Sequence, residues 1–224
     1  SSDLQFFGKT VKLYAPLYVS NYCVNNCPYC GYSEHSKYSQ KILTIDEIVK
    51  EAVTISESGI QEILLVAGDD PKRITAEYLA DAVAAVKEIA PSVTIETAAL
   101  EEDEYRLLVD TGLDGVTLYQ ETYNRELHTE LHAGGLKEDF EYRYETPIRA
   151  GNAGIRRFGM GVLLGLNDWC ADIPKLIANA QEVQRRCWTC SVSLSFPRIN
   201  PCMSDYKPPS VVSDRELVQI ISAA

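Results

Sequence analysis

The stretch Pro16-Leu-Tyr-Val-Ser-Asn-Tyr-Cys23-Val-Asn-Asn-Cys27-Pro-Tyr-Cys30 joins a run of strand-forming residues to a loop with three cysteines within eight residues. This spacing is typical of metal ligation rather than of a disulfide framework. Three thiolates on one tight loop can bind three irons of a cubane [4Fe–4S] cluster, which leaves the fourth iron without a ligand from this loop. The next cysteine is Cys170, which is consistent with an open iron. We therefore expect an iron–sulfur site at Cys23, Cys27 and Cys30.

Two other interpretations of these cysteines remain open from the residues alone. His35 follows Cys30 after four intervening residues, so a zinc ion with three Cys ligands and one His ligand fits the spacing. The chain would then be a zinc-stabilised binding module. Alternatively, the three residues are reduced cysteines in the core, because free Cys is often buried. The cluster is favoured because this loop follows the first strand of a large α/β chain, whereas small zinc modules tend to stand alone.

Short β-rich runs recur along the chain, and several of them are almost continuously apolar, which is typical of parallel strands covered on both faces. The expected strands are residues 16–21, 62–68, 93–100, 115–121, 158–165 and 191–199. Helical patterns lie between them. One begins at a Thr44/Glu47 capping box and ends at Gly59, one runs from about 139 to 151 or 154, and one covers 174–186. A second capping box at Ser213 and Glu216 opens the last helix.

Six β-then-α units predict a parallel sheet with right-handed crossovers. Six is too few for a closed eight-stranded barrel, so an open, curved (β/α)6 barrel or a doubly wound sheet remains. In either fold, ligands bind at the carboxyl ends of the strands. We therefore expect the site where residues 21–32, 68–70, 98–100, 120–123, 165–167 and 196–198 converge.

Composition narrows the class of protein further. The 224 residues are enough for one domain with a sizeable core, and the net charge of −11 disfavours a nucleic-acid partner. No apolar run approaches the length of a membrane span. Seven cysteines, three of them clustered, fit a reducing compartment, and we expect the cytoplasm.

The cysteine spacing, with Tyr29 before the last Cys, resembles the signature of the radical S-adenosylmethionine (SAM) superfamily. The resemblance extends along nearly the whole chain. Within the superfamily, the chain is similar to the aromatic amino acid lyase branch, and specifically to its tyrosine lyases of thiamine biosynthesis. The segments that carry it are 15–21, Leu118-Tyr-Gln-Glu-Thr-Tyr123, 153–156, 163–169, Ser193-Leu-Ser-Phe-Pro-Arg198 and 201–202. It implies a partial (β/α)6 barrel that binds a [4Fe–4S] cluster and SAM. The implied reaction is cleavage of the Cα–Cβ bond of L-tyrosine to 2-iminoacetate (dehydroglycine) and p-cresol.

The resemblance also implies roles for residues around SAM. Gly68-Asp69 would support the SAM amino group, Glu121 would contact the SAM moiety, and Arg143 would pair with the SAM carboxylate. Tyr29 would pack at the adenine. Asp69 departs from the Glu of the family and reaches one methylene less far, and Asp70 could compensate. Ordinary alternatives are an acidic turn before Pro71 and an exposed helical Arg143.

For the substrate, the resemblance implies that Arg198 anchors the carboxylate of tyrosine. Ser193 and Ser195 share one face of a strand, and one of them would help to fix the substrate amino group. Ordinary polar strand positions are the alternative for both serines.

Two further pairs of residues are interpreted as structural. Cys187 and Cys190 lack a matching pair at zinc spacing, which favours packing. His128 and His132 lie four residues apart without a Glu-containing zinc motif, so we expect a surface helix turn.

The resemblance finally implies an electron donor protein and a thiazole synthase partner. Related hydrogenase-maturation tyrosine lyases and tryptophan lyases are alternative functions within the branch. Compared with family members, residues 1–224 are expected to be a single core domain that lacks N-terminal and C-terminal portions of a longer protein.

Overall fold

The computed structural model describes residues 11–33, 38–200 and 206–224. Within them the chain forms one sheet of six parallel strands in sequential order. The strands are β1 (Tyr14–Ser20), β2 (Glu62–Ala67), β3 (Ser92–Glu96), β4 (Gly115–Thr117), β5 (Arg157–Gly161) and β6 (Ser191–Ser195). Every crossover therefore steps in the same direction. A doubly wound sheet reverses direction at a switch point, so the observed order establishes the open (β/α)6 barrel and excludes the doubly wound alternative.

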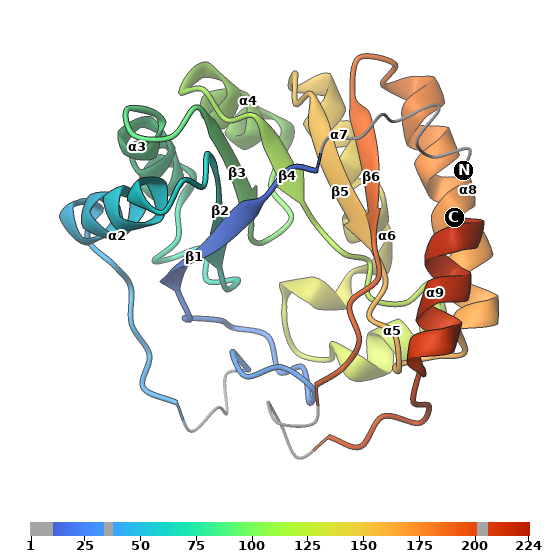
Figure 1. Ribbon diagram of the computed structural model, residues 1–224. Coiled ribbons are helices and arrows are strands. Elements are labelled where there is room, and N and C mark those ends of the chain that lie inside the picture. The colour runs from blue at the N-terminus through green and yellow to red at the C-terminus, as the bar shows by residue number, and fades with distance from the viewer. Residues whose placement is uncertain (1–10, 34–37, 201–205) are drawn as a thin grey trace.

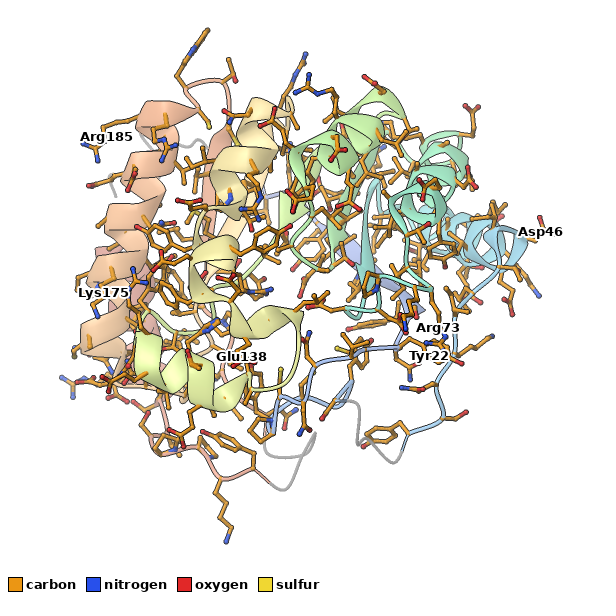
Figure 2. The ribbon with its side chains drawn as sticks, turned by 180° about the vertical axis from the view of Figure 1, so that it is seen from behind. Tyr22, Asp46, Arg73, Glu138, Lys175 and Arg185 are labelled. Atoms are coloured by element: carbon orange, nitrogen blue, oxygen red, sulfur yellow. The ribbon has the colours of Figure 1, made fainter. Side chains whose placement is uncertain are left out.

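The helices lie outside this curved sheet, and Figure 1 shows α2 and α3 at one end of it and α8 and α9 at the other. Figure 2 shows the same separation, with Asp46 of α2 and Arg185 of α8 on opposite sides of the molecule. The helices are α2 (Ile45–Glu57), α3 (Ala76–Lys87), α4 (Glu102–Asp110), α5 (Arg125–Leu131), the 3₁₀ helix η1 (Leu136–Glu138), α6 (Phe140–Tyr144), α7 (Thr146–Asn152), α8 (Trp169–Arg186) and α9 (Asp214–Ala223). Between the helices and the strands lies the main hydrophobic core, which includes Ile63, Leu65, Leu79, Ile95 and Phe158.

The expected strands are confirmed, but their carboxyl ends are shorter than predicted. β3 stops at Glu96 and β4 at Thr117, whereas the apolar pattern continues in both. Beyond β4, pairing with the β5 side continues through Gln120 N–H, which donates to the Gly161 carbonyl, and through a parallel bridge between Glu121 and Val162. Beyond β6, a parallel bridge joins Leu164 and Arg198. Regular strand geometry is therefore lost where the chain turns into the loops that surround the site.

Both predicted capping boxes are present. Glu47 N–H donates to Thr44 Oγ1 while Thr44 N–H donates to the Glu47 carboxylate, and Ser213 and Glu216 repeat the arrangement. The single helix expected after residue 139 is instead two helices, α6 and α7. Pro147 lies in the first turn of α7, and because it has no N–H it cannot continue the hydrogen-bond ladder of α6.

The helix predicted to begin at Pro174 begins five residues earlier, at Trp169. Asp168 is its N-cap, and the Asp168 side chain accepts a hydrogen bond from Cys170 N–H. Within the described residues, no helix combines the length and apolar character needed to cross a membrane.

Candidate active site

The loop after β1 places three sulfurs on one cavity. Cys23, Cys27 and Cys30 are free thiols that line a cavity of about 470 Å³ at the carboxyl ends of the strands. The loop folds tightly, because Cys30 N–H donates to the Cys27 carbonyl at 3.2 Å. Two N–H groups point at sulfur: Tyr32 N–H lies 3.4 Å from Cys30 Sγ, and Asn25 Nδ2 lies 3.6 Å from Cys23 Sγ.

This donor set fits an iron–sulfur cluster. Burial raises the pKa of all three thiols, that of Cys27 to about 11, so a bound cation must supply the charge that keeps them as thiolates. Among the described residues, no three His, Cys, Asp or Glu side chains surround a single ion position. A cubane takes each sulfur on a different iron, whereas one zinc ion needs a compact tetrahedral set. The fourth ligand of the zinc alternative, His35, lies outside the described residues.

The end of β2 holds this loop in place. Gly68 N–H donates to the Ser20 carbonyl at 3.1 Å, and Val24 N–H donates to the Asp69 carbonyl at 2.8 Å. A Cβ atom on Gly68 would lie 2.2 Å from the Tyr22 carbonyl oxygen, a separation that backbone atoms cannot accept. Glycine is therefore required at position 68 so that the cysteine loop can cross the end of β2.

Asp69 and Asp70 have different surroundings. Asp69 lines the cavity, and its Oδ2 accepts a 2.7 Å hydrogen bond from Asn25 Nδ2. Asp70 is buried and faces away toward Arg73, with Oδ2 at 2.5 Å from Nη1. It also accepts from Lys72 N–H, as in an Asx turn. The turn interpretation thus applies to Asp70, and the expectation that Asp70 compensates for Asp69 is wrong.

Arg73 also contacts Tyr22, the residue that precedes the cysteine loop. Its guanidinium carbon lies 4.5 Å from the centre of the Tyr22 ring, and Figure 2 shows the two labels side by side next to the segment that follows β1. A cation over an aromatic face is attractive. The residue before Cys23 is therefore fastened to the turn after β2.

Glu121 is the carboxylate at the centre of the site. It follows β4, is buried, and among the described residues is the one non-glycine residue with a positive φ, 70°. Its Oε1 lies 2.5 Å from Lys137 Nζ and 3.9 Å from Arg143 Nη2. A buried carboxylate at a strand end is costly unless it is paired, and this one has two cations beside it. The strained backbone aims its side chain into the cavity that the cysteines line.

Arg143 and Lys137 supply the positive charge of the cavity. Arg143 is buried in α6 and its Nε donates to the Tyr119 carbonyl at 2.7 Å, so the alternative of an exposed helical arginine is wrong. Lys137 of η1 is a residue that sequence reasoning missed. Burial has the largest effect on its ammonium and lowers the pKa, but the neighbouring negative groups, Glu121 first among them, together bring the pKa above its ordinary value. A lysine in a glycine-containing loop has no periodic signal that could have revealed it.

Glu96 is a second residue that sequence reasoning missed. It ends β3 and lines the same cavity. Burial, followed by repulsion from Glu121, raises the pKa of Glu96 to about 7. A Glu at the end of a strand is a sequence signal for a residue of the site. Because the apolar pattern continues after residue 96, the sequence predicts a longer strand and hides this signal.

Tyr29 lines the cavity from the cysteine loop, and its hydroxyl lies 2.6 Å from His132 Nε2. His128 and His132 are both 0% exposed, so the expected surface helix turn is wrong. Their i,i+4 spacing places His128 of α5 and His132, the C-cap residue of α5, on the same inner face. Helix α5 lies at the same end of the barrel as the loop after β1 (Figure 1). Cys187 and Cys190 are buried in the hydrophobic core, as expected from packing.

The three residues expected to bind substrate are not in the cysteine cavity. Ser193 and Ser195 line a neighbouring cavity of about 150 Å³ inside the barrel, and Tyr119 borders both cavities. Arg198 Nη1 donates to the Val212 carbonyl at 3.1 Å and to Asp214 Oδ1 at 2.7 Å. The structure thus brings together the cysteines, Tyr29, Gly68, Asp69, Glu121 and Arg143, and places Arg198, Ser193 and Ser195 apart from them.

An open, parallel (β/α)6 barrel with three cysteines on the loop after its first strand is the architecture of a radical SAM enzyme, and the sequence comparison agrees with this class. Residues 17–177 match the Radical SAM superfamily, and the chain belongs to this family, whose members use SAM together with a [4Fe–4S] cluster. Cys23, Cys27 and Cys30 are the residues that would hold the cluster.

Within the family, the chain is similar to 2-iminoacetate synthases. It is 40% identical over 220 residues to that of Escherichia coli (strain K12) and 37% identical to that of Salmonella typhimurium (strain LT2). Each alignment covers 98% of this chain and 58% of the relative, so the chain spans less than two thirds of their length. Among solved structures, a HydG, a maturase of the [FeFe]-hydrogenase, superposes with a TM-score of 0.93 at 30% identity, over 98% of this chain and 50% of HydG. Methylornithine synthase (PylB) has the same fold, with a TM-score of 0.76 at 24% identity.

Proposed function

We propose that this chain is the core of a radical SAM tyrosine lyase, which cleaves the Cα–Cβ bond of L-tyrosine to 2-iminoacetate and p-cresol for thiamine thiazole biosynthesis. The observation that carries the proposal is the convergence of Cys23, Cys27, Cys30, Glu121 and Arg143 on one cavity. It is supported by 37–40% identity to 2-iminoacetate synthases. When bound, the cluster supplies the electron that cleaves SAM, and SAM supplies the radical that takes a hydrogen atom from tyrosine.

The residues of this chain bind and orient the reactants. SAM carries an amino group, a carboxylate and a sulfonium charge, so its site must offer charges of both signs. The cavity does so: Asp69 and Glu121 are acidic, and Lys137 and Arg143 are basic. We assign the SAM carboxylate to Arg143, whose planar guanidinium suits carboxylate geometry, the amino group to Gly68-Asp69, and the adenine to Tyr29.

Tyrosine is assigned to the interior of the barrel. Arg198 would anchor its carboxylate, and Ser193 or Ser195 its amino group. This assignment requires Arg198 to exchange Asp214 for the substrate carboxylate. The exchange costs little free energy, because the Asp214 side chain is 91% exposed and an exposed ion pair contributes little to stability.

The reaction also requires protein partners and a suitable compartment. One electron is consumed for each SAM cleaved, so we assign an electron donor protein to this enzyme. A thiazole synthase would receive the 2-iminoacetate, which hydrolyses in water. The free thiols of the described residues fit the reducing cytoplasm.

A hydrogenase-maturation tyrosine lyase is the second candidate, favoured by the TM-score of 0.93 to HydG. Anaerobic reconstitution followed by product analysis tests both candidates. With SAM, a reductant and tyrosine, we expect p-cresol and 2-iminoacetate, and the Cys27→Ala variant should give neither. Formation of p-cresol from tyrosine supports both candidates, and turnover of tryptophan but not tyrosine would refute both.

A further inference from the structure

The two histidines on the inner face of α5 are not explained by packing alone. The His128 and His132 ring centres lie 4.2 Å apart, and the His128 ring meets Phe140 edge-to-face at 5.2 Å. Within the described part of the chain, three of their four ring nitrogens have no hydrogen-bond partner, namely His128 Nδ1 and Nε2 and His132 Nδ1. A buried polar atom without a partner costs free energy. An apolar residue would therefore be cheaper at position 128.

His132 differs from His128 in one contact. Its Nε2 lies 2.6 Å from the Tyr29 hydroxyl, in a buried hydrogen bond between residues 103 positions apart in the sequence. The two rings meet edge-to-face at 5.8 Å. The contact is a direct hydrogen bond between two side chains in the interior of the protein.

The Tyr29–His132 contact joins two parts of the site. Tyr29 lies between Cys27 and Cys30 and lines the cavity that Glu121 also lines. His132 follows α5, the helix that comes directly after Glu121-Thr122-Tyr123. Leu131, Cys27 and Tyr29 belong to the same small apolar cluster. The hydrogen bond thus fixes the tyrosine ring of the cysteine loop relative to the helix that follows the central carboxylate.

We propose that His132 is a positioning residue for SAM binding: it holds the Tyr29 ring against the cavity by its hydroxyl, so that the adenine side of the site is formed before SAM arrives. This inference rests on the proposed role of the cavity as the SAM site. His128 has no such role, although it is equally buried on the same helix face.

The test is SAM affinity measured by equilibrium dialysis on anaerobically reconstituted protein, with iron and sulfide content determined on each sample. Loss of one side-chain hydrogen bond corresponds to about a fivefold to tenfold change in an equilibrium constant. We expect His132→Phe and Tyr29→Phe each to weaken SAM binding by about that factor, and the double variant no further. Iron content should stay at the wild-type level, and His132→Gln, which keeps a hydrogen-bonding group, should recover most of the affinity.

His128→Phe is the matched control. It removes an imidazole of the same burial that makes no hydrogen bond to Tyr29, so SAM affinity should change less than about twofold, because no bond to the site is lost. Equal losses for His128→Phe and His132→Phe, or wild-type affinity in Tyr29→Phe, would overturn the proposal. If His132→Phe does not fold, comparison of the SAM affinities of the single variants Tyr29→Phe and His128→Phe tests the proposal. Wild-type protein that binds no SAM refutes the proposed function instead, so the two failures are distinguishable.

Discussion

Asn25 Nδ2 donates a 2.7 Å hydrogen bond to Asp69 Oδ2, while Asn25 Oδ1 accepts a 3.0 Å hydrogen bond from Lys137 N–H. One buried amide therefore fastens the cysteine loop both to the end of β2 and to the segment that carries the cavity lysine. A shorter acid at position 69 suits this arrangement, because the Asp69 carboxylate is held by Asn25 next to the cavity.

Removing this amide should loosen the loop. We expect Asn25→Ala to lower the free energy of unfolding by about 2 kcal/mol, since it removes two hydrogen bonds, one to the half-buried Asp69 carboxylate and one from Lys137 N–H. Urea unfolding of the metal-free protein measures the change. The matched control is Asn26→Ala, an exposed neighbour whose side chain bonds only Ser33 among the described residues, which should cost less than about 0.5 kcal/mol. Equal costs for the two variants would contradict the role of Asn25.

The Lys137–Glu121 pair should matter more when it is broken than when it is removed. Lys137→Met leaves a buried carboxylate with only Arg143, 3.9 Å away, and breaking a buried pair costs about 3 kcal/mol or more. The double variant Lys137→Met/Glu121→Gln should regain much of that stability. A double-mutant cycle by urea unfolding measures the coupling, and purely additive effects would show that the two side chains do not interact.

Glu96 gives the fold a pH dependence of known sign. Its pKa is about 7 in the folded protein against 4.5 for the free group, so between these values the folded state holds more protons than the unfolded state. Stability therefore falls as pH rises from about 4.5 to 7, by about 3 kcal/mol for this group.

Glu96→Gln isolates this contribution. Relative to wild type, we expect the variant to gain stability at pH 8 and little or none at pH 4.5, where Glu96 is protonated in the folded protein. Urea unfolding of the metal-free protein at the two pH values is the measurement. A gain of the same size at both pH values would mean that Glu96 is not the titrating group.

Gly68 should be required for the iron site because of its contact with the cysteine loop. Gly68→Ala would bring a Cβ atom to 2.2 Å from the Tyr22 carbonyl oxygen and 3.1 Å from Cys23 Cβ, so the loop must shift. We expect a large loss of bound iron after reconstitution. Gly59→Ala is the control, since Gly59 has a positive φ of 91° but nothing within 4 Å of the added Cβ. It should cost stability by about 1 kcal/mol and leave iron content unchanged.

Arg198 and Asp214 separate the substrate role from a structural role. If Arg198 binds the tyrosine carboxylate, Arg198→Gln should raise the KM for tyrosine by about tenfold or more, with iron content and SAM affinity unchanged. Asp214→Ala should leave KM equal or lower, because it removes the group that competes for Arg198. Steady-state kinetics of p-cresol formation distinguishes the two roles. An increase in KM for Asp214→Ala would mean that the Arg198–Asp214 pair has a structural role.

Much of the fold could be predicted because local signals and global pattern agree. Thr44 and Ser213 each begin a helix through a capping box that depends only on neighbouring residues. Buried parallel strands such as β2 are visible as apolar runs. Strand ends were less predictable, because residues such as Ala98 and Ala99 remain apolar after β3 has ended, where they pack against the core from a loop.

The site was predictable only where chemistry is local in sequence. The three cysteines fall within one loop, and Glu121 ends an apolar run. Lys137 and Asn25 act through contacts that cross the barrel and have no sequence pattern of their own. The burial of His132 depends on the cysteine loop lying over α5, and helical spacing alone does not indicate which face of a short helix is covered.

The proposed function depends on three cysteines that hold a cluster whose remaining iron binds SAM. EPR spectroscopy of the anaerobically reconstituted, reduced protein, recorded with and without SAM on samples of known iron and sulfide content, tests it most directly. We predict about four irons and four sulfides per chain and a cluster spectrum that changes when SAM is added. A protein that contains zinc without sulfide, or a cluster spectrum that SAM leaves unchanged, would contradict it.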